Sequence, residues 1–272
     1  MEIPKSWTSD EESDWKSSTE FVRVHEAVRT KTTVSEMRVS VYCGNNDPPD
    51  RFETDIFQLK KLLRTNKKLV RFHILFDRIH STHSADLDTI DVLQTLFGDR
   101  FHPYTLKKIG VSCAGGFDLT QPFLSLSYLA SSVAYNPSLE TLRLNNLCIH
   151  CSAADEFVSA LLSNKVLKHL ELSNVTFLSS IEPLCDAIAA HPRISTVDLY
   201  GRTESYDYFV HQMCKSLLSK NKPLENLRIV SICRGSSPKC YDLLSEFLTT
   251  PLCGCKCLSL EVCSLDFCSG PS

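Results

Sequence analysis

The sequence predicts an α/β solenoid in which a parallel β-sheet lines the concave face and helices cover the convex face. Three observations lead to this fold class. A short apolar pattern recurs at steps near 28 residues, a helical pattern lies between successive copies, and each helical pattern ends in a short polar turn. A unit of this size cannot bury its own apolar face, so its copies are expected to stack side by side.

The apolar pattern is clearest in Leu139-x-x-Leu142-x-Leu144 and its copy Leu167-x-x-Leu170-x-Leu172, which begin 28 residues apart. Alternation of apolar and polar residues is typical of a strand with one buried face. About eight such rows occur, beginning at Val34, Leu69, Leu106, Leu139, Leu167, Ile194, Leu224 and Cys257. If they stack, Leu142, Leu170, Val197 and Leu227 form one continuous buried file.

The spacing of the rows divides the chain. Residues 1–20 are polar and acidic, and we expect a flexible segment there. The solenoid is expected over 21–272, irregular over 21–120 and regular over 121–272. The array stops soon after a strand, without a polar capping unit, so we also expect a fragment of a longer array or one that packs its end on another copy.

Between the rows, apolar residues recur three and four positions apart, which predicts amphipathic helices. Pro183 falls in the first turn of one of them, where its missing N–H costs nothing. The helix residues expected in the core include Phe157, Val158, Leu161, Leu162, Ile181, Leu184, Cys185, Ile188, Phe209, Val210, Met213, Cys214, Leu217 and Leu218. Polar turns such as Asn164-Lys165 and His191-Pro192-Arg193 lead straight into the next row, which favours parallel neighbours.

With these rows, the chain resembles the ribonuclease-inhibitor type of leucine-rich repeat, which also occurs in cytosolic immune sensors. The resemblance implies a horseshoe-shaped array that binds proteins. One departure concerns the ninth position of each row, where the family places Asn or Cys so that side chains satisfy turn backbone groups along a ladder. Here that position holds Leu147, Val175, Arg202, Ile232 and Leu265, so we expect the ladder to be largely missing.

Composition narrows the class of partner and the compartment. The 272 residues are 43% hydrophobic and 22% charged, with a formal net charge of −3, which supplies no basic field for nucleic acid or anionic lipid. No apolar run is long enough to span a bilayer, and the N-terminus has no apolar signal core. We therefore expect a cytoplasmic protein with a protein partner, and reduced thiols for its 13 cysteines.

Motifs for chemistry are weak. Phosphate loops and nucleophile elbows do not occur in the sequence. His80, His83 and Asp86, with Asp77 upstream, are close enough to hold a metal, and Cys253-x-Cys255-x-Cys257, followed by Cys263 and Cys268, could face one way on an extended segment. A polar loop and packed apolar thiols are the plainer interpretations, so the sequence predicts no metal, no cofactor and no enzyme.

The candidate site lies on the concave face, to which the third, fifth and seventh positions of each row point. The residues selected for partner binding are Arg143, Asn145, Glu171, Asp198, Tyr200 and Arg228. Tyr and Arg dominate interface energies, and opposite charges set the register of a partner. A solvated sheet face would also be charged, so that alternative stays open. The fifth position also includes Glu261, in the row that begins at Cys257.

The predicted function is a non-catalytic protein-protein interaction scaffold that uses this face and the rim loops. The alternative is a regulator of an enzyme, either GTPase-activating or recruiting substrates for a ubiquitin ligase. The first would need an exposed Arg on a rim loop, for which Arg202 and Arg234 are candidates. The second would need an apolar adaptor-binding helix, which residues 1–33 do not supply.

Overall fold

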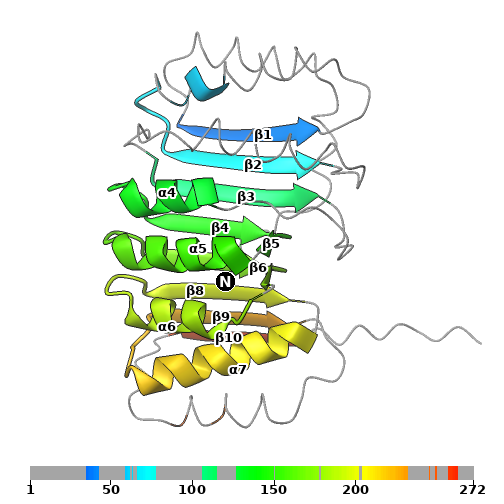
Figure 1. Cartoon of the computed structure of the whole chain (residues 1–272), viewed down its shortest axis with the longest axis vertical. Helices are drawn as coiled ribbons and strands as arrows, with labels where there is room; N and C mark the ends of the chain where they lie inside the picture. The colour runs from blue at the N-terminus through cyan, green and yellow to red at the C-terminus, as the bar shows by residue number, and fades with distance from the viewer. Residues whose placement is uncertain are drawn as a thin grey trace, which may run out of the picture.

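In the computed structural model of the chain, described residues form a stack of strands flanked on one side by helices (Figure 1). The described residues are 35–42, 59–61, 63, 66–77, 106–114, 127–149, 151–177, 179–201, 204–231, 245, 249 and 257–262.

Eight parallel strands make one continuous sheet. The strands are β1 (Glu36–Tyr42), β2 (Arg71–Asp77), β3 (Lys108–Ala114), β4 (Thr141–Asn145), β6 (His169–Ser173), β8 (Thr196–Gly201), β9 (Asn226–Ser231) and β10 (Cys257–Val262). They follow one another in chain order, and every pairing between neighbours is parallel. Two short strands, β5 (Cys148–Ile149) and β7 (Thr176–Phe177), form a separate parallel pair. The predicted parallel α/β class is therefore confirmed.

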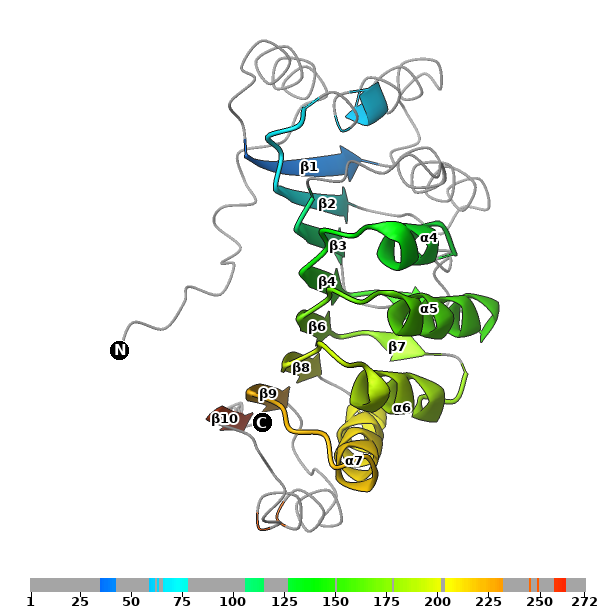
Figure 2. The ribbon, with the colours of Figure 1, turned by 90° about the vertical axis from the view of Figure 1, so that its left-hand side faces the viewer.

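The helices lie on one side of this sheet. They are α4 (Ser127–Tyr135), α5 (Cys151–Ser163), α6 (Glu182–Ala190) and α7 (Glu204–Ser219). Figure 2 shows that the strand stack is bowed and that these helices follow its outer side. The arrangement fits a repeat solenoid. Among the described helices, none is long and apolar enough to cross a bilayer.

The core lies between the sheet and the helices, and the fourth and sixth positions of the rows build its sheet side. Leu142, Leu170, Val197 and Leu227 are each at most 1% exposed and are paired in register. They form the continuous buried file expected from the sequence. Burying one such side chain contributes about 1.5–3 kcal/mol, so this file is a main source of stability.

The helix positions agree with the expected core, with three exceptions. Leu184 and Cys185 of α6 are buried, and Pro183 occupies the first turn as expected. Leu162 of α5, however, is 42% exposed, and Val158 of α5 and Leu218 of α7 are only partly buried. Each of the three directly follows a fully buried residue. Since successive helix residues are about 100° apart, only one of two adjacent apolar residues can point directly at the sheet.

The turns that lead from helix to strand are tied to one another by buried polar side chains. Asn164 Oδ1 accepts hydrogen bonds from the backbone N–H groups of Val166 (2.8 Å) and Leu167 (2.7 Å), while its Nδ2 donates to the carbonyl of Val133 (2.6 Å) in the preceding unit. Asn136 repeats this pattern one unit earlier, donating to the carbonyl of Leu106. Each side chain thus pairs with backbone N–H groups of its own turn and with a backbone carbonyl of the preceding unit.

His191 takes the same place in the next unit. Its Nδ1 accepts from the N–H groups of Arg193 (3.1 Å) and Ile194 (3.0 Å), so its proton is on Nε2, which donates to the carbonyl of Asn164 (2.8 Å). Lys222 then donates from Nζ to the carbonyl of His191 (2.7 Å). We refer to Asn136, Asn164, His191 and Lys222 as the turn ladder.

Two asparagines beside the ninth position correct, in part, the expectation that an asparagine ladder is largely missing. Besides the turn ladder, Asn146 Nδ2 donates to the carbonyl of Cys113 (3.0 Å), and Asn174 Nδ2 donates to Asn146 Oδ1 (3.0 Å). Asn146 and Asn174 lie one position before the ninth, with φ values of 52° and 49°. Asparagine tolerates this left-handed conformation better than other residues with a side chain, which explains why it occurs there.

The register of β10 corrects a second expectation. Cys257 pairs with Asn226, Ser259 with Arg228 and Glu261 with Val230. The last row therefore begins two residues earlier than predicted, at Cys255, and Glu261 is in the seventh position instead of the fifth. Cys257, expected in a core position, is in register with an outward residue of β9. A shift of two residues leaves the alternating Leu258, Leu260 and Val262 on the same face of the strand, so the apolar alternation within the strand does not reveal it.

Candidate functional site

The site is built on the face of the sheet that carries no helices. By the open face we mean the strand residues that alternate with the buried ones and point away from the helices. On β4, β6, β8 and β9 these are Thr141, Arg143, Asn145, His169, Glu171, Ser173, Thr196, Asp198, Tyr200, Asn226, Arg228 and Val230. All six residues selected from the sequence lie on this face.

Parallel register brings four of the six side by side. Arg143 pairs with Glu171, Glu171 with Asp198, and Asp198 with Arg228. We refer to these four residues as the central column; its charges run plus, minus, minus, plus. The other two, Asn145 and Tyr200, lie two residues further along β4 and β8, separated by Ser173 of β6.

Arg143 and Glu171 form an ion pair at one end of the central column. The Arg143 Nε atom is 2.8 Å from Glu171 Oε2, and the two side chains are 42% and 22% exposed. Burial raises the pKa of Glu171 above its ordinary value; Arg143 opposes this shift and Asp198 adds to it. Glu171 is therefore a partly dehydrated carboxylate that lies opposite the Asp198 carboxylate.

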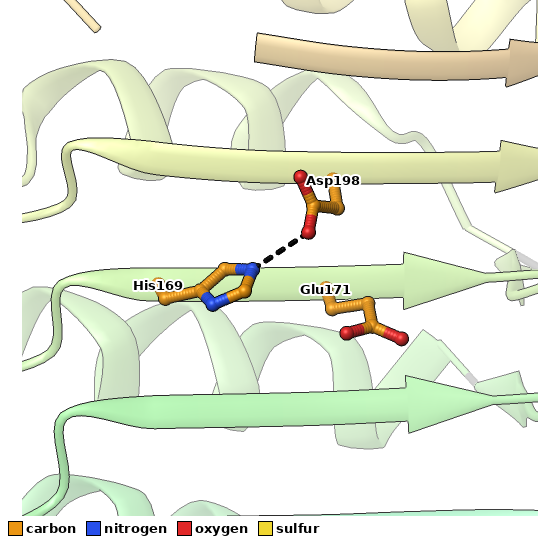
Figure 3. A group of neighbouring side chains, drawn as sticks. All are labelled: His169, Glu171 and Asp198. Carbon is orange, nitrogen blue, oxygen red and sulfur yellow. Dashed lines mark hydrogen bonds and ion pairs between the residues drawn. The ribbon is translucent and has the colours of Figure 1, made fainter. Parts of the chain in front are cut away.

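His169 and Asp198 make the second contact, between β6 and β8. His169 Nε2 is 2.8 Å from Asp198 Oδ2, and the side chains are 24% and 15% exposed (Figure 3). His169 was not among the residues selected from the sequence. The third position of each row was expected to point to this face, so that position in the row beginning at Leu167 was the available signal.

Tyr200 and Arg228 form the third contact. Arg228 NH1 donates to the Tyr200 hydroxyl (2.9 Å), and the guanidinium carbon lies 5.3 Å from the centre of the tyrosine ring. The contact combines a hydrogen bond with a cation–π interaction, which together hold both flexible side chains in one geometry. Both side chains are half-buried on the open face.

The first three strands present a different surface. The His73 ring lies against Gly110, where an added Cβ would be 2.6 Å from the ring, and its Nε2 is 2.8 Å from Ser112 Oγ. Burial lowers the pKa of His73 to about 4, and the positive charges of Arg38 and Arg143 contribute to this shift. His73 is therefore neutral at physiological pH, and its ring covers the sheet where a side chain is lacking.

Among the described residues, His169, Glu171 and Asp198 offer ligand atoms that all lie within 4.8 Å of one another. The metal candidates found in the sequence cannot be compared with this group: His80, His83, Asp86, Cys253 and Cys255 lie outside the described residues, as do Cys263 and Cys268. Asp77 ends β2 and Cys257 begins β10. Arg202 and Arg234, considered for a GTPase-activating role, and the segment 1–20, which was expected to be flexible, are also outside them.

Comparisons with known proteins give little further guidance. No family model matches the chain, and no curated protein matches it. Among solved structures it is similar to "Leiomodin-1 Actin-Binding Site 2 (ABS2)", with 11% identity and a TM-score of 0.32, covering 74% of this chain and 89% of that one. A likeness at this level carries no argument about fold or function.

Proposed function

We propose that this chain is a leucine-rich-repeat horseshoe of the ribonuclease-inhibitor type that works in the cytoplasm as a non-catalytic scaffold. It binds a protein partner through the open face, which forms the concave side, and through the rim loops beside it. The observation that carries the proposal is the set of interlocked charged and aromatic side chains on the open face, Arg143–Glu171 and Tyr200–Arg228 above all.

Prior ordering of these side chains supports binding. Each long side chain that is immobilised on association costs about 0.5–1.5 kcal/mol, and Arg143 and Arg228 are already held by partners within the sheet. Tyrosine and arginine are also the residue types that contribute most to interfaces. A surface that is ordered before it meets its partner keeps more of its interaction energy for affinity.

The charge pattern suggests a partner of mixed charge. The central column places two acidic groups between two basic ones, so a complementary surface presents basic groups at its middle and acidic groups at its ends. A polyanion such as nucleic acid would meet Glu171 and Asp198 directly. A folded protein or peptide with both signs fits this column better.

The experiment is affinity capture from cytosol with the whole chain, followed by quantitative mass spectrometry. The two test variants are Tyr200→Ala and Arg228→Ala. Their matched controls carry the same changes on other surfaces: Tyr135→Ala at the end of α4, where Tyr135 is 67% exposed, and Arg193→Ala in the exposed turn before β8. A true partner loses at least about tenfold in recovery with either test variant and is unchanged with either control.

Thermal unfolding accompanies the capture, because a drop in recovery has meaning only if the variant remains folded. We expect both test variants to melt within a few degrees of the parent chain. Recovery of every protein at parental levels with Tyr200→Ala and Arg228→Ala would remove the open face from the proposal and leave the rim loops.

A further inference from the structure

Three side chains, one imidazole and two carboxylates, lie close together on the open face between β6 and β8. His169 and Glu171 are two residues apart on β6 and therefore point to the same side, and Asp198 is the register partner of Glu171 on β8. All three are half-buried, and one ligand atom from each lies within 4.8 Å of the other two (Figure 3). The convergence is set by the register of the sheet and so does not depend on loop geometry.

We propose that His169, Glu171 and Asp198 bind one divalent transition-metal ion of the zinc class on the open face.

The separations suit a common ion. Two ligand atoms that each lie about 2.0–2.2 Å from one ion, in tetrahedral or octahedral geometry, are about 2.8–3.6 Å apart. His169 Nε2 and Asp198 Oδ2 are 2.8 Å apart, at the short end of this range. They are now joined by a hydrogen bond, so a bound ion would replace the proton between them, and a neutral His169 would carry its proton on Nδ1. Glu171 is within 4.8 Å of both, so a shift of about an ångström in its side chain completes the set. A rotation about its side-chain torsions supplies such a shift without moving the strand.

The charges of the site also suit a cation. Glu171 and Asp198 are carboxylates directly opposite each other on adjacent strands, an arrangement that destabilises a sheet. Arg143 neutralises one side of Glu171 through Oε2. Since a carboxylate has two oxygens with several acceptor positions, a metal can bind while Arg143 remains beside the other oxygen.

The ligand types select the class of metal. One imidazole with two carboxylates suits zinc and its neighbours, such as cobalt, whereas magnesium and calcium prefer sites made of oxygen alone. Three protein ligands leave at least one coordination position, and the open face turns that position toward solvent. A water molecule or a carboxylate or imidazole of a bound protein would fill it.

The direct test adds Co²⁺ to the whole reduced chain. Zinc binding alone would not separate the proposed site from a site at any of the 13 cysteines, whereas the absorption spectrum of Co²⁺ does. Thiolate ligands give Co²⁺ an intense sulfur-to-metal charge-transfer band, whereas nitrogen and oxygen ligands give only weaker visible bands. We expect the parent chain to bind one equivalent of Co²⁺ that shows only the weaker visible bands of nitrogen and oxygen ligands. Glu171→Gln and Asp198→Asn should each weaken its affinity by at least about tenfold.

The matched control is Glu140→Gln. Glu140 is also a carboxylate near the sheet, but its two neighbours are Lys107 (3.6 Å) and Lys168 (3.3 Å), which hold its pKa below the ordinary value and leave no place for a cation. This variant should bind Co²⁺ as the parent does. Indistinguishable titrations of the parent and Asp198→Asn would overturn the proposal.

A variant that is expected to bind Co²⁺ more tightly shows that weaker binding by the other variants is not simply a result of misfolding. Arg143→Met keeps all three ligands and removes the cation that competes for Glu171, so we expect it to bind Co²⁺ several-fold more tightly. Addition of Zn²⁺ should likewise raise the melting temperature of the parent by more than that of Asp198→Asn. Weaker binding by a folded Arg143→Met variant would contradict the role given to Glu171.

Discussion

Two histidines, His191 and His169, show how differently this sheet uses one residue type at its turns and on its open face. His191 is fully buried, and both ring nitrogens are committed to backbone groups, with Nδ1 accepting from two N–H groups and Nε2 donating to the carbonyl of Asn164. His169 is 24% exposed and contacts a carboxylate on the neighbouring strand. The first histidine joins two units of the stack, and the second is available to a ligand.

The contrast extends to their surroundings. The turn ladder uses neutral groups against backbone partners, apart from the terminal Lys222, so every buried donor and acceptor of Asn164 and His191 has a partner. The open face uses charged groups against other side chains, which remain partly hydrated. Substitutions in the turn ladder should therefore change stability, and substitutions on the open face should change binding.

The largest effect on stability is expected for Asn164→Ala. The change removes the donor to Val133 and leaves the N–H groups of Val166 and Leu167 without their acceptor in a buried turn. Such losses lower the free energy of unfolding by about 2–4 kcal/mol. Denaturant unfolding followed by circular dichroism measures it.

Asn226→Ala is the matched control for this prediction. Asn226 is exposed on the open face and donates to the Thr196 hydroxyl at 3.2 Å. Its loss should alter the free energy of unfolding by no more than about 0.5 kcal/mol. Equal effects of the two substitutions would remove the distinction between turn ladder and open face.

His191→Asn tests whether the turn ladder accepts either residue. Asparagine at this place in the preceding unit, Asn164, makes the same kinds of hydrogen bond, so we expect a change within about 1 kcal/mol at neutral pH. The parent and variant should differ in acid. Burial lowers the pKa of His191 from its ordinary 6.5, so below that pH the unfolded chain binds a proton that the folded chain does not.

Acid should therefore destabilise the parent chain more than the His191→Asn variant. As the pH falls below 6.5, the parent loses stability through His191, whereas His191→Asn does not, so the variant gains relative to the parent. Denaturant unfolding of both chains at neutral and mildly acidic pH gives the difference, in which contributions from other groups such as His73 cancel. A difference that does not change with pH would mean that His191 is not held neutral by its turn.

A small effect on stability is also expected for Asp198→Asn without added metal. The His169–Asp198 contact is partly exposed, the amide can still accept a hydrogen bond from His169, and the change relieves repulsion with Glu171. We expect the free energy of unfolding to change by less than about 1 kcal/mol, measured by denaturant unfolding in the presence of a chelator. A loss comparable to that of Asn164→Ala would make Asp198 part of the framework of the fold.

The sequence predicted the parallel stack well because burial alternates along each strand, and that alternation is visible in a pattern such as Leu139-x-x-Leu142-x-Leu144. It could not give the register of β10, because Cys255-x-x-Leu258-x-Leu260 and Cys257-x-x-Leu260-x-Val262 both satisfy the pattern. The horseshoe shape and the identification of the repeat family remain predictions.

The candidate site was predicted only in part, because row position fixes some of its neighbours and not others. Placement of Arg143, Glu171, Asp198 and Arg228 side by side follows from row position alone, so it could be expected once the rows were aligned. The bonds of Asn164 and His191 to the preceding unit depend on distances between groups that are 31 and 27 residues apart in the chain. No local pattern encodes those distances, and the same holds for the contact between His169 and Asp198.

In-register pairing also bears on how such a chain evolves. Because residues at equivalent positions lie next to one another, loss of the single segment 167–193 would join Val166 to Ile194 and leave the alternation of the sheet intact. Arg143 would then become the neighbour of Asp198, and both His169 and Glu171 would be gone. Loss of this one segment would thus change the row of charged side chains on the open face in one step.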